Sequence, residues 1–307
     1  SILAQAQNTF DGLWWIKARK TDANINEHQL VDSVRGGNLA FTSPSPLTQG
    51  TYLAPAGDSV AWCWDSGGNT QTDSSTSNPF EYQVNEKAGF EIQYTTNPGD
   101  LVSTSVLPHH LGKAPEFIIF KATTGNFFWV YHKDANAPNG THQAGQLALN
   151  NNQGFTVVNG YFDSAPTDTT YDPGTTFASG AWPGALFASY LWTSVPGYSA
   201  FGSYQGNNST DGVFVALPFR PAFVMTKNVT AASDWLILDT TREPYNPSTQ
   251  GLLPNDAREE LPLTGGGVDI VSNGFKARQA GSFINDSETY IYAAFAENPF
   301  QAPATAR

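Results

Sequence analysis

Short apolar runs alternate along this chain with turns rich in Gly, Pro, Asn and Ser. Runs such as FEIQY at 90–94, FIIFK at 117–121 and FFWVYHK at 127–133 mix aromatic and β-branched residues, which is typical of buried strands. Proline stands just before several runs, where a missing N–H costs a sheet least. The pattern predicts an all-β fold made of tandem antiparallel β-sandwich units of a jelly-roll-like kind.

Three of these runs end in a lysine: WWIK at 14–17, IIFK at 118–121 and FVMTK at 223–227. The lysines are spaced by 104 and 106 residues, a domain-sized period. Each copy closes on an alternating strand, which reads VAWCW at 60–64, ASYLW at 188–192 and IYAAF at 291–295. The matched offsets predict a three-copy internal repeat.

The repeat divides the chain into a first, incomplete β unit at 1–64, a second β-sandwich unit at 88–196 and a third at 197–307. Residues 65–87 contain a long polar stretch with little to bury, which predicts a linker or long loop. The first copy lacks the Gly-aromatic strand that opens the other two. Either residues that precede Ser1 are missing, or a neighbour supplies the absent strand.

The repeat also makes two predictions about side chains. Trp129 and Trp235 should occupy matched, buried positions in the second and third copies. The ammonium groups of Lys17, Lys121 and Lys227 should reach a polar edge, with Asp32 or Asp239 as the partner. An alternative is that these lysines guard edge strands against aggregation.

Charge and composition narrow the class of protein. The net charge of −12 argues against a nucleic-acid partner, which requires clustered Lys and Arg. No apolar run is long enough for membrane insertion to be expected. Cys63 is the single cysteine, so no internal disulfide can form and stability must come from packing.

Several motifs together carry a resemblance to a known family. They are WIKAR with VDSVRG, HHLGKAPEFIIFK with WVYHK, GYSAFGSYQGN with DGVFVALPFRPAFVMTK, and YIYAAFAENPF near the end. As a set they resemble a repeat domain of virion structural and tail-fibre-like proteins of bacteriophages, common in cyanophages and other aquatic phages. The resemblance implies location in a virion, an extracellular particle assembled in the host cytoplasm. The family has no catalytic residues to carry over, and LPHHLG departs from its usual His-Gly-Leu-Gly turn.

The residues themselves offer little for catalysis. Glycan-cleaving enzymes need two carboxylates at a fixed separation, and no strand here places acidic residues at alternate positions. His109, His110 and His132 lack carboxylate or thiol neighbours at ligand spacing, so a structural turn is favoured over a metal site. The polar loop at 166–175 could hold Ca²⁺, but it lacks EF-hand spacing. No catalytic residues, cofactors or metal ligands are therefore predicted.

A loop found only in the second copy, YDPGTTFASGAWPG at 171–184, supplies the candidate ligand-binding residues. Tyr171 and Trp182 would stack on sugar faces if their rings were exposed, since loops carry binding sites on rigid scaffolds. The equally weighted alternative is that this loop packs at an interface between chains.

Together these observations predict a non-enzymatic phage virion structural protein, a tail-fibre or receptor-binding component that contacts the host cell surface. Its expected partners are other virion proteins and a host-surface glycan, and it should be a homo-oligomer, with a trimer favoured. The alternative within the virion is a capsid decoration, or cement, protein. A glycan-degrading enzyme is the alternative from another class, and the missing carboxylate pair disfavours it.

Overall fold

The computed structural model of the protein describes residues 11–24, 26–43, 49–76, 79–96, 106–125, 127–177, 185–281 and 283–299. Regular structure within these residues is almost entirely β-strand. The helical segments among them are the single turn α2 (Lys133–Asn136) and the 3-10 turn η1 (Thr175–Phe177). The prediction of an all-β fold of antiparallel sheets is confirmed.

Three large sheets form the framework of the described residues. The first sheet has the order β4-β3-β2-β1-β5 and contains β1 (Gly12–Ala18), β2 (His28–Asp32), β3 (Leu39–Ser43), β4 (Gly50–Thr51) and β5 (Ser59–Asp65). The second has the order β11-β10-β15-β8-β7-β6 and contains β6 (Gln71–Asp73), β7 (Phe80–Asn85), β8 (Phe90–Thr95), β10 (Phe117–Ala122), β11 (Phe128–His132) and β15 (Phe187–Trp192). The third has the order β16-β24-β18-β19 and contains β16 (Ser199–Gln205), β18 (Pro221–Asn228), β19 (Leu236–Asp239) and β24 (Thr289–Ala296).

Shorter strands form smaller sheets. In the second unit, β9 (Leu107–Pro108) pairs with β14 (Thr170–Tyr171), and β12 (Gly145–Gln146) pairs with β13 (Thr156–Val157). In the third unit, β17 (Phe214–Ala216), β23 (Gly274–Ala277) and β22 (Val268–Val271) form one sheet, and β20 (Gln250–Gly251) pairs with β21 (Leu261–Pro262).

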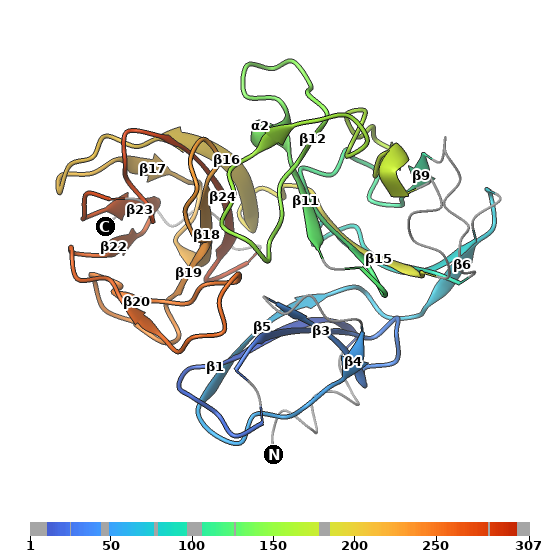
Figure 1. Cartoon of the computed structure of the whole chain (residues 1–307), viewed down its shortest axis with the longest axis horizontal. Helices are drawn as coiled ribbons and strands as arrows, with labels where there is room; N and C mark the ends of the chain where they lie inside the picture. Colours follow the sequence, from blue (N-terminus) through green and yellow to red (C-terminus); the bar gives the residue numbers. More distant parts are fainter. Residues whose placement is uncertain are drawn as a thin grey trace.

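The three large sheets surround one shared core. Figure 1 shows β1 and β5 at the bottom, β11 and β15 at the upper right, and β18 and β24 at the left. Side chains from one face of every sheet enter the same hydrophobic cluster, which includes Trp64, Trp192 and Phe295 from the three closing strands. The Trp64 ring lies 5.8 Å from the Trp192 ring and 5.3 Å from the Phe295 ring, centroid to centroid. The units are therefore not separate domains in a row but three sides of one packed body.

In the second and third sheets the opposite face is also covered, and this makes the sandwiches. In the third unit, Val224 packs with Val268 and Phe275 of the outer layer. In the second, Phe120 packs with Tyr171 and Phe177. Alternate residues of one strand thus serve two cores, which explains why the central strands are apolar at nearly every position. The predicted β-sandwich architecture is confirmed in these units.

The three lysine strands occupy corresponding places. Each is bonded to the strand that follows it in the chain and to the strand that closes its unit: β1 to β2 and β5, β10 to β11 and β15, β18 to β19 and β24. The registers also correspond, because Lys17 lies opposite Val60, Lys121 opposite Ala188 and Lys227 opposite Ile291. This correspondence is what a repeat requires, and the full three-copy repeat stays a prediction.

Two sequence-based expectations are wrong in detail. Residues 65–87, expected to be a linker, contain β6 and β7, which extend the second sheet; Phe80 is buried there and anchors the segment. Trp129 and Trp235 are both buried, but they do not match. In the second sheet Trp129 lies opposite Phe120, the residue before the lysine. In the third sheet the residue before the lysine is Thr226, and Leu236 lies opposite it, one position after Trp235. The two rings therefore enter different cores.

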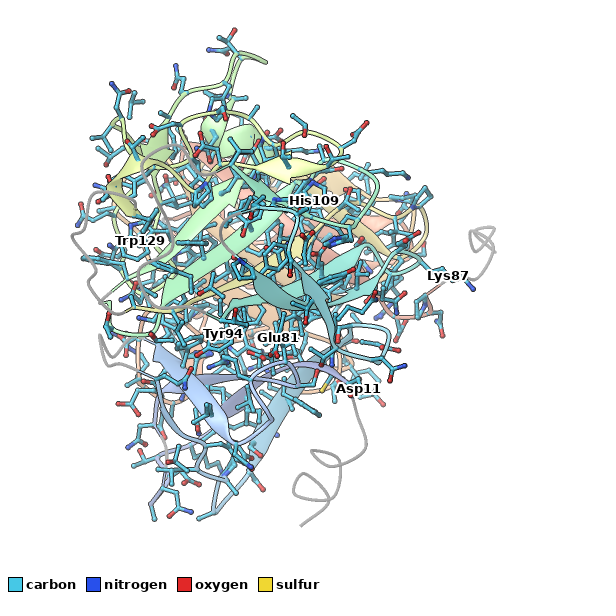
Figure 2. All side chains as sticks on the ribbon, turned by 90° about the vertical axis from the view of Figure 1, so that its right-hand side faces the viewer. Asp11, Glu81, Lys87, Tyr94, His109 and Trp129 are labelled. Atoms are coloured by element: carbon cyan, nitrogen blue, oxygen red, sulfur yellow. The ribbon has the colours of Figure 1, made fainter. Side chains whose placement is uncertain are left out.

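Polar contacts tie the units together around the shared core. Asp32 and Arg35 form a fully buried ion pair at 2.6 Å, and the Tyr190 hydroxyl of the second unit donates to Asp32 Oδ2 at 2.7 Å. Figure 2 shows Tyr94 and Glu81 near the level where the first and second units meet. In the third unit, Asp239 and Arg242 form the corresponding pair. Glu260 joins Arg242 to Arg19 of the first unit.

Candidate functional site

The predicted ligand-binding residue Tyr171 is not at the surface. Its side chain is 1% exposed, and its hydroxyl donates to Gln93 Oε1 at 2.9 Å and lies 2.7 Å from Ser189 Oγ. The ring fills the second outer core, so it has no face to offer a sugar, and the prediction that it is an exposed loop aromatic is wrong. Trp182, the other predicted residue, lies outside the described residues.

The three lysines are the most unusual polar groups in the core. They are at most 1% exposed, and no carboxylate of the described residues forms an ion pair with them; Asp32 and Asp239 pair with Arg35 and Arg242 instead, so the predicted contact with a polar edge and with Asp32 or Asp239 is wrong. Backbone carbonyls accept from them instead. Lys17 Nζ donates to Ala18 O, Lys121 Nζ to Gly125 O, and Lys227 Nζ to Asn228 O and Ser233 O at 2.7 and 2.8 Å. Burial lowers the pKa of Lys17 and Lys121 to about 8 and that of Lys227 to about 7.

These lysines lie at the seams between units. Lys227 Nζ also reaches Asn152 O of the second unit, and Lys17 Nζ reaches Ala257 O of the third. Lys121 Nζ lies 5.8 Å from the centroid of the Phe41 ring of the first unit. With so little exposed surface, the amines have no route to a substrate. Their contacts indicate a structural role in joining the three units.

A hollow on the second unit is the better candidate for a site. Its floor is the segment that follows β12, held beside β11 because Val130 N donates to Leu147 O at 2.8 Å and Leu149 N donates to Phe128 O at 2.9 Å. Phe155 N donates to Val229 O of the third unit at 2.8 Å, which fixes the far end of the loop. The hollow therefore rests on backbone that is bonded on both sides.

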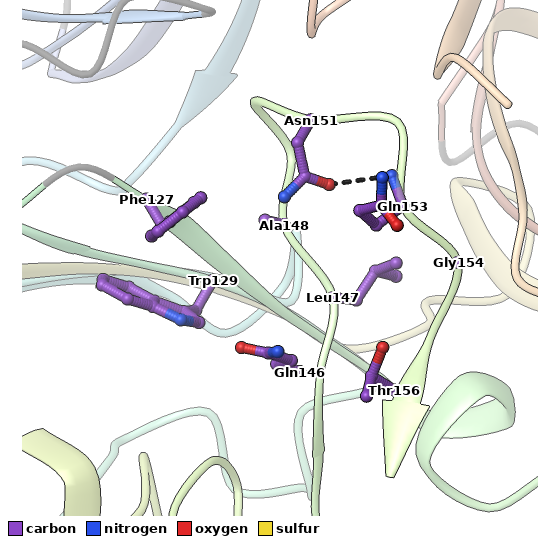
Figure 3. A pocket seen from close by; sticks show the side chains of 9 residues that line it. All are labelled: Phe127, Trp129, Gln146, Leu147, Ala148, Asn151, Gln153, Gly154 and Thr156. Carbon is purple, nitrogen blue, oxygen red and sulfur yellow. Dashed lines mark hydrogen bonds between the residues drawn. The ribbon is translucent and has the colours of Figure 1, made fainter. Parts of the chain in front are cut away.

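The walls combine aromatic rings with amide and hydroxyl groups. Figure 3 shows Phe127 and Trp129 on one side of the loop, with Gln146, Asn151, Gln153 and Thr156 around the remaining rim. The Phe127 ring is 42% exposed and lies 5.7 Å from the Trp129 ring at 62°, while Trp129 itself is almost buried. Trp129 is held from behind by Phe177, whose ring is 4.8 Å away. Phe127 is thus an exposed apolar surface on a rigid support.

The polar groups of the hollow are partly uncommitted. Asn151 Oδ1 accepts from Gln153 N at 3.0 Å, which shapes the loop. The Gln146 carboxamide and the Thr156 hydroxyl make no hydrogen bond to other described residues, so their donors and acceptors are available to a ligand. The hollow holds about 300 Å³, at the small end of the range for small-molecule sites, about 300–1,000 Å³.

No ionisable side chain is among the described residues that line this hollow. It therefore presents aromatic surface, amides and a hydroxyl without a general acid, a general base or an anionic nucleophile. A neutral ligand rich in hydroxyl groups matches these walls, because its C–H faces pack on the ring and its hydroxyls bond the amides. The described walls therefore have the chemistry to bind such a molecule.

The histidines weighed in the sequence have structural partners. His109 Nε2 lies 2.9 Å from Thr167 O, and His132 Nε2 lies 3.2 Å from Tyr292 O of the third unit. His110 lies between Glu91 and Asp73, at 3.1 Å from a carboxylate oxygen of each. Within the described ranges no group of three His, Cys, Asp or Glu side chains has the geometry to hold a metal ion.

Sequence reasoning missed the hollow because nothing in FFWVYHK separates Phe127 from the buried residues after it. The strand pattern alone makes every ring in this run a core residue. A weak signal was present: NNNQG at 150–154 is an amide-rich turn that returns toward the same strand, and such turns carry polar contacts on rigid scaffolds.

The fold and the hollow define a class: an all-β protein with three large antiparallel sheets around a shared core, and with a neutral hollow of aromatic and amide groups on the second of them. The chain belongs to the family described as domain of unknown function DUF7483, which it matches over residues 47–299. The matched range includes every strand from β4 to β24 and leaves out β1, β2 and β3. No curated protein and no solved structure matches the chain. Among the described residues, no helix is long and apolar enough to cross a membrane.

Proposed function

We propose that this protein is a non-enzymatic structural component of a phage virion that attaches to neutral carbohydrate on the host cell surface, as a tail fibre or receptor-binding protein does. The observation that carries the binding activity is the hollow at Phe127, Gln146 and Thr156, which has ring surface and free hydrogen-bonding groups but no ionisable side chain among the described residues that line it. The virion role rests on the sequence resemblance to phage repeat domains described above.

The absence of charge in the hollow favours a particular ligand class. Sulfated or uronic-acid polymers need cationic contacts, and Lys and Arg do not line this site among the described residues. The whole chain carries a net charge of −12, which also repels anionic polymers. Neutral hexose-containing oligosaccharides are the expected ligands.

A small, solvent-facing site of this kind binds weakly on its own. Linking several copies raises the effective concentration of sites and increases the apparent affinity without any new contact. A homotrimer would supply that linkage through symmetry. The proposal therefore includes a homo-oligomer, with a trimer favoured, and other virion proteins as its assembly partners.

The experiment measures binding and cleavage together. Purified protein is incubated with neutral host-surface polysaccharide, and bound saccharide and released reducing ends are both followed. We expect binding without release of reducing ends. Phe127→Ala should weaken binding by about tenfold, because the lost ring surface is worth on the order of 1–2 kcal/mol. Phe214→Ala is the matched control, since Phe214 is 44% exposed on β17 in the third unit and should leave binding unchanged.

Other outcomes separate the alternatives. Release of reducing ends would overturn the proposal in favour of a glycan-degrading enzyme. If the protein neither binds nor cleaves the polysaccharide, and light scattering shows a monomer, the capsid decoration role becomes the better assignment. Equal loss of binding in both phenylalanine variants would show that the hollow is not the site.

A further inference from the structure

Strand β5 leaves the first sheet open on one side. In the second and third sheets the closing strand has a partner on each side: β15 lies between β10 and β8, and β24 lies between β18 and β16. Among the described residues β5 pairs only with β1. The position that β8 and β16 fill in their sheets therefore has no occupant in the first sheet among the residues that the structure describes.

The open side presents backbone groups ready for pairing. The ladder to β1 continues beyond both ends of β5, because Arg19 N donates to Asp58 O and Ser66 N donates to Asp11 O. The even-numbered residues of β5 therefore bond to β1. In an antiparallel strand the residues between them direct their N–H and C=O groups away from that partner, so the odd-numbered residues of β5 face the open side. Ser59, Ala61, Cys63 and Asp65 are those residues, so they line an edge that is unpaired among the described residues.

A groove runs beside this edge. It holds about 390 Å³ and is lined by Trp62, Cys63 and Trp64 of β5 on one side and by Tyr198, Phe223 and Phe295 of the third unit on the other. Trp62 is 8% exposed, and its indole N–H has no hydrogen-bond partner among the described residues. A buried, unpaired donor in an aromatic groove costs free energy until an acceptor arrives.

The other two sheets show what fits such an edge. In the second sheet, Phe90 lies opposite Trp192 and Ile92 lies opposite Tyr190, and both side chains enter the shared core. In the third sheet, Phe201 of β16 lies opposite Ala293 and enters the same core. In both cases the occupant is an antiparallel strand that begins beside a Gly-aromatic step and directs alternate side chains inward.

We propose that the open edge of β5 is a strand-acceptor site, which takes an extended segment of another polypeptide chain as an additional antiparallel strand. The segment carries apolar side chains at alternate positions, as β8 does with Phe90 and Ile92, and these fill the groove beside Trp62 and Trp64. Main-chain hydrogen bonds to Ala61 and Cys63 supply affinity, and the inward side chains supply specificity. This surface is separate from the carbohydrate hollow and serves assembly.

The test uses the full chain and a synthetic peptide with the sequence of residues 88–96, AGFEIQYTT. By correspondence with the second sheet, the peptide residue at position 91 should lie opposite Cys63 and the one at position 94 opposite Val60. Cys63 is exposed and is the only cysteine of the chain. Two peptides are prepared, one with Glu91→Cys and one with Tyr94→Cys, each activated as a thiopyridyl disulfide. The Cys63 thiolate attacks the sulfur of the peptide cysteine, and thiopyridone leaves. The product is a mixed disulfide between Cys63 and the peptide.

We expect the Glu91→Cys peptide to label Cys63 at least about tenfold faster than the Tyr94→Cys peptide, because residues opposite each other in an antiparallel pair lie within disulfide reach. Ala61→Pro should abolish that preference, since proline removes an N–H on the open side and places its ring there. Equal labelling by the two peptides, or labelling by neither, overturns the proposal. This comparison uses the unaltered chain and so does not depend on the folding of the proline variant.

Discussion

The imidazole of His110 lies flat on the ring of Tyr82, with 3.8 Å between the ring centroids and 6° between the planes. The two ring nitrogens of His110 meet Glu91 and Asp73 at 3.1 Å each. One histidine thus connects the turn after β9 to β8 and to β6 and β7, the two strands that lie in the segment predicted to be a linker. Burial lowers the pKa of His110, but the two carboxylates outweigh it and hold the pKa above its ordinary value.

This contact predicts a pH-dependent stability. Because the pKa of His110 is higher in the folded protein than in the unfolded chain, its protonated form stabilises the fold. This contribution to the free energy of unfolding is complete below the pKa of the unfolded chain, about 6.5, and is lost as the pH rises through the folded pKa. The free energy of unfolding lost in His110→Gln should therefore be largest near pH 5.5 and smaller near pH 8.5. Urea unfolding at both pH values measures it. His109→Gln is the neighbouring control: burial lowers the pKa of His109, so its protonation does not stabilise the fold. A loss that is the same at both pH values would show that charge on His110 contributes nothing.

Lys227 should produce the opposite trend at alkaline pH. Its pKa is about 7 in the folded protein, and the unfolded value is about 10.4. Between these values the unfolded chain binds a proton that the folded chain does not, so the free energy of unfolding rises with pH. Lys227→Met should remove that part of the rise. Unfolding of both proteins at pH 7.5 and 9.5 measures the difference, which should be on the order of a few kcal/mol. Lys87→Met, at an exposed position, is the control, and an unchanged slope in Lys227→Met would contradict the assignment.

The buried pair of Asp32 and Arg35 should be strongly coupled. Both side chains are fully buried, and Arg35 also donates to Leu30 O and Tyr190 Oη, so Asp32→Asn leaves a guanidinium without its counter-charge. We expect that variant to lose about 3–5 kcal/mol of unfolding free energy. The double variant Asp32→Asn with Arg35→Met should lose clearly less than the sum of the two single losses. Additive losses in denaturant unfolding would show that the pair is not a unit.

Trp235 should be a major contributor to stability. It is 1% exposed in the shared core, and its indole N–H donates to Ala148 O of the second unit at 2.9 Å. Trp235→Ala should cost about 3–5 kcal/mol through the cavity it leaves. Trp235→Phe keeps most of the ring and removes the donor, so its cost should be smaller. Thermal or urea unfolding of both variants gives the comparison, and a loss below about 1 kcal/mol for Trp235→Ala would contradict the packing described here.

The sequence predicted the strand class and the central strands well, because IIFK and FVMTK carry apolar residues on both faces and only a doubly buried strand tolerates that. It could not predict which polar groups would be buried. Lys17 and Lys227 look like edge residues until carbonyls of Ala257 and Asn152, in other units, meet their amines. Tyr171 looks like a loop aromatic until Gln93 and Ser189 meet its hydroxyl. These partners are far apart in the chain, and single-sequence patterns record only local spacing.

The same limit explains the one-residue error between Trp129 and Trp235. Both residues follow a lysine strand and both are tryptophan, so the sequence comparison aligned them with each other. Side chains of a strand alternate between its two faces, so a shift of one residue places a side chain in the other core. The exposure of Phe127 was not predicted for the same reason. It depends on where the pairing of β11 with β10 ends, and the sequence of this run does not mark that residue.

The shared core has a consequence for how this protein can grow. Trp64, Trp192 and Phe295 meet at its centre, so each unit contributes a side of a closed triangle and none can be added or cut out without opening the middle to water. A longer protein of this architecture would have to add complete sets of three units, each set with its own shared core. A fragment that contains one unit should fail to fold alone, and the 307 residues should unfold in a single cooperative step.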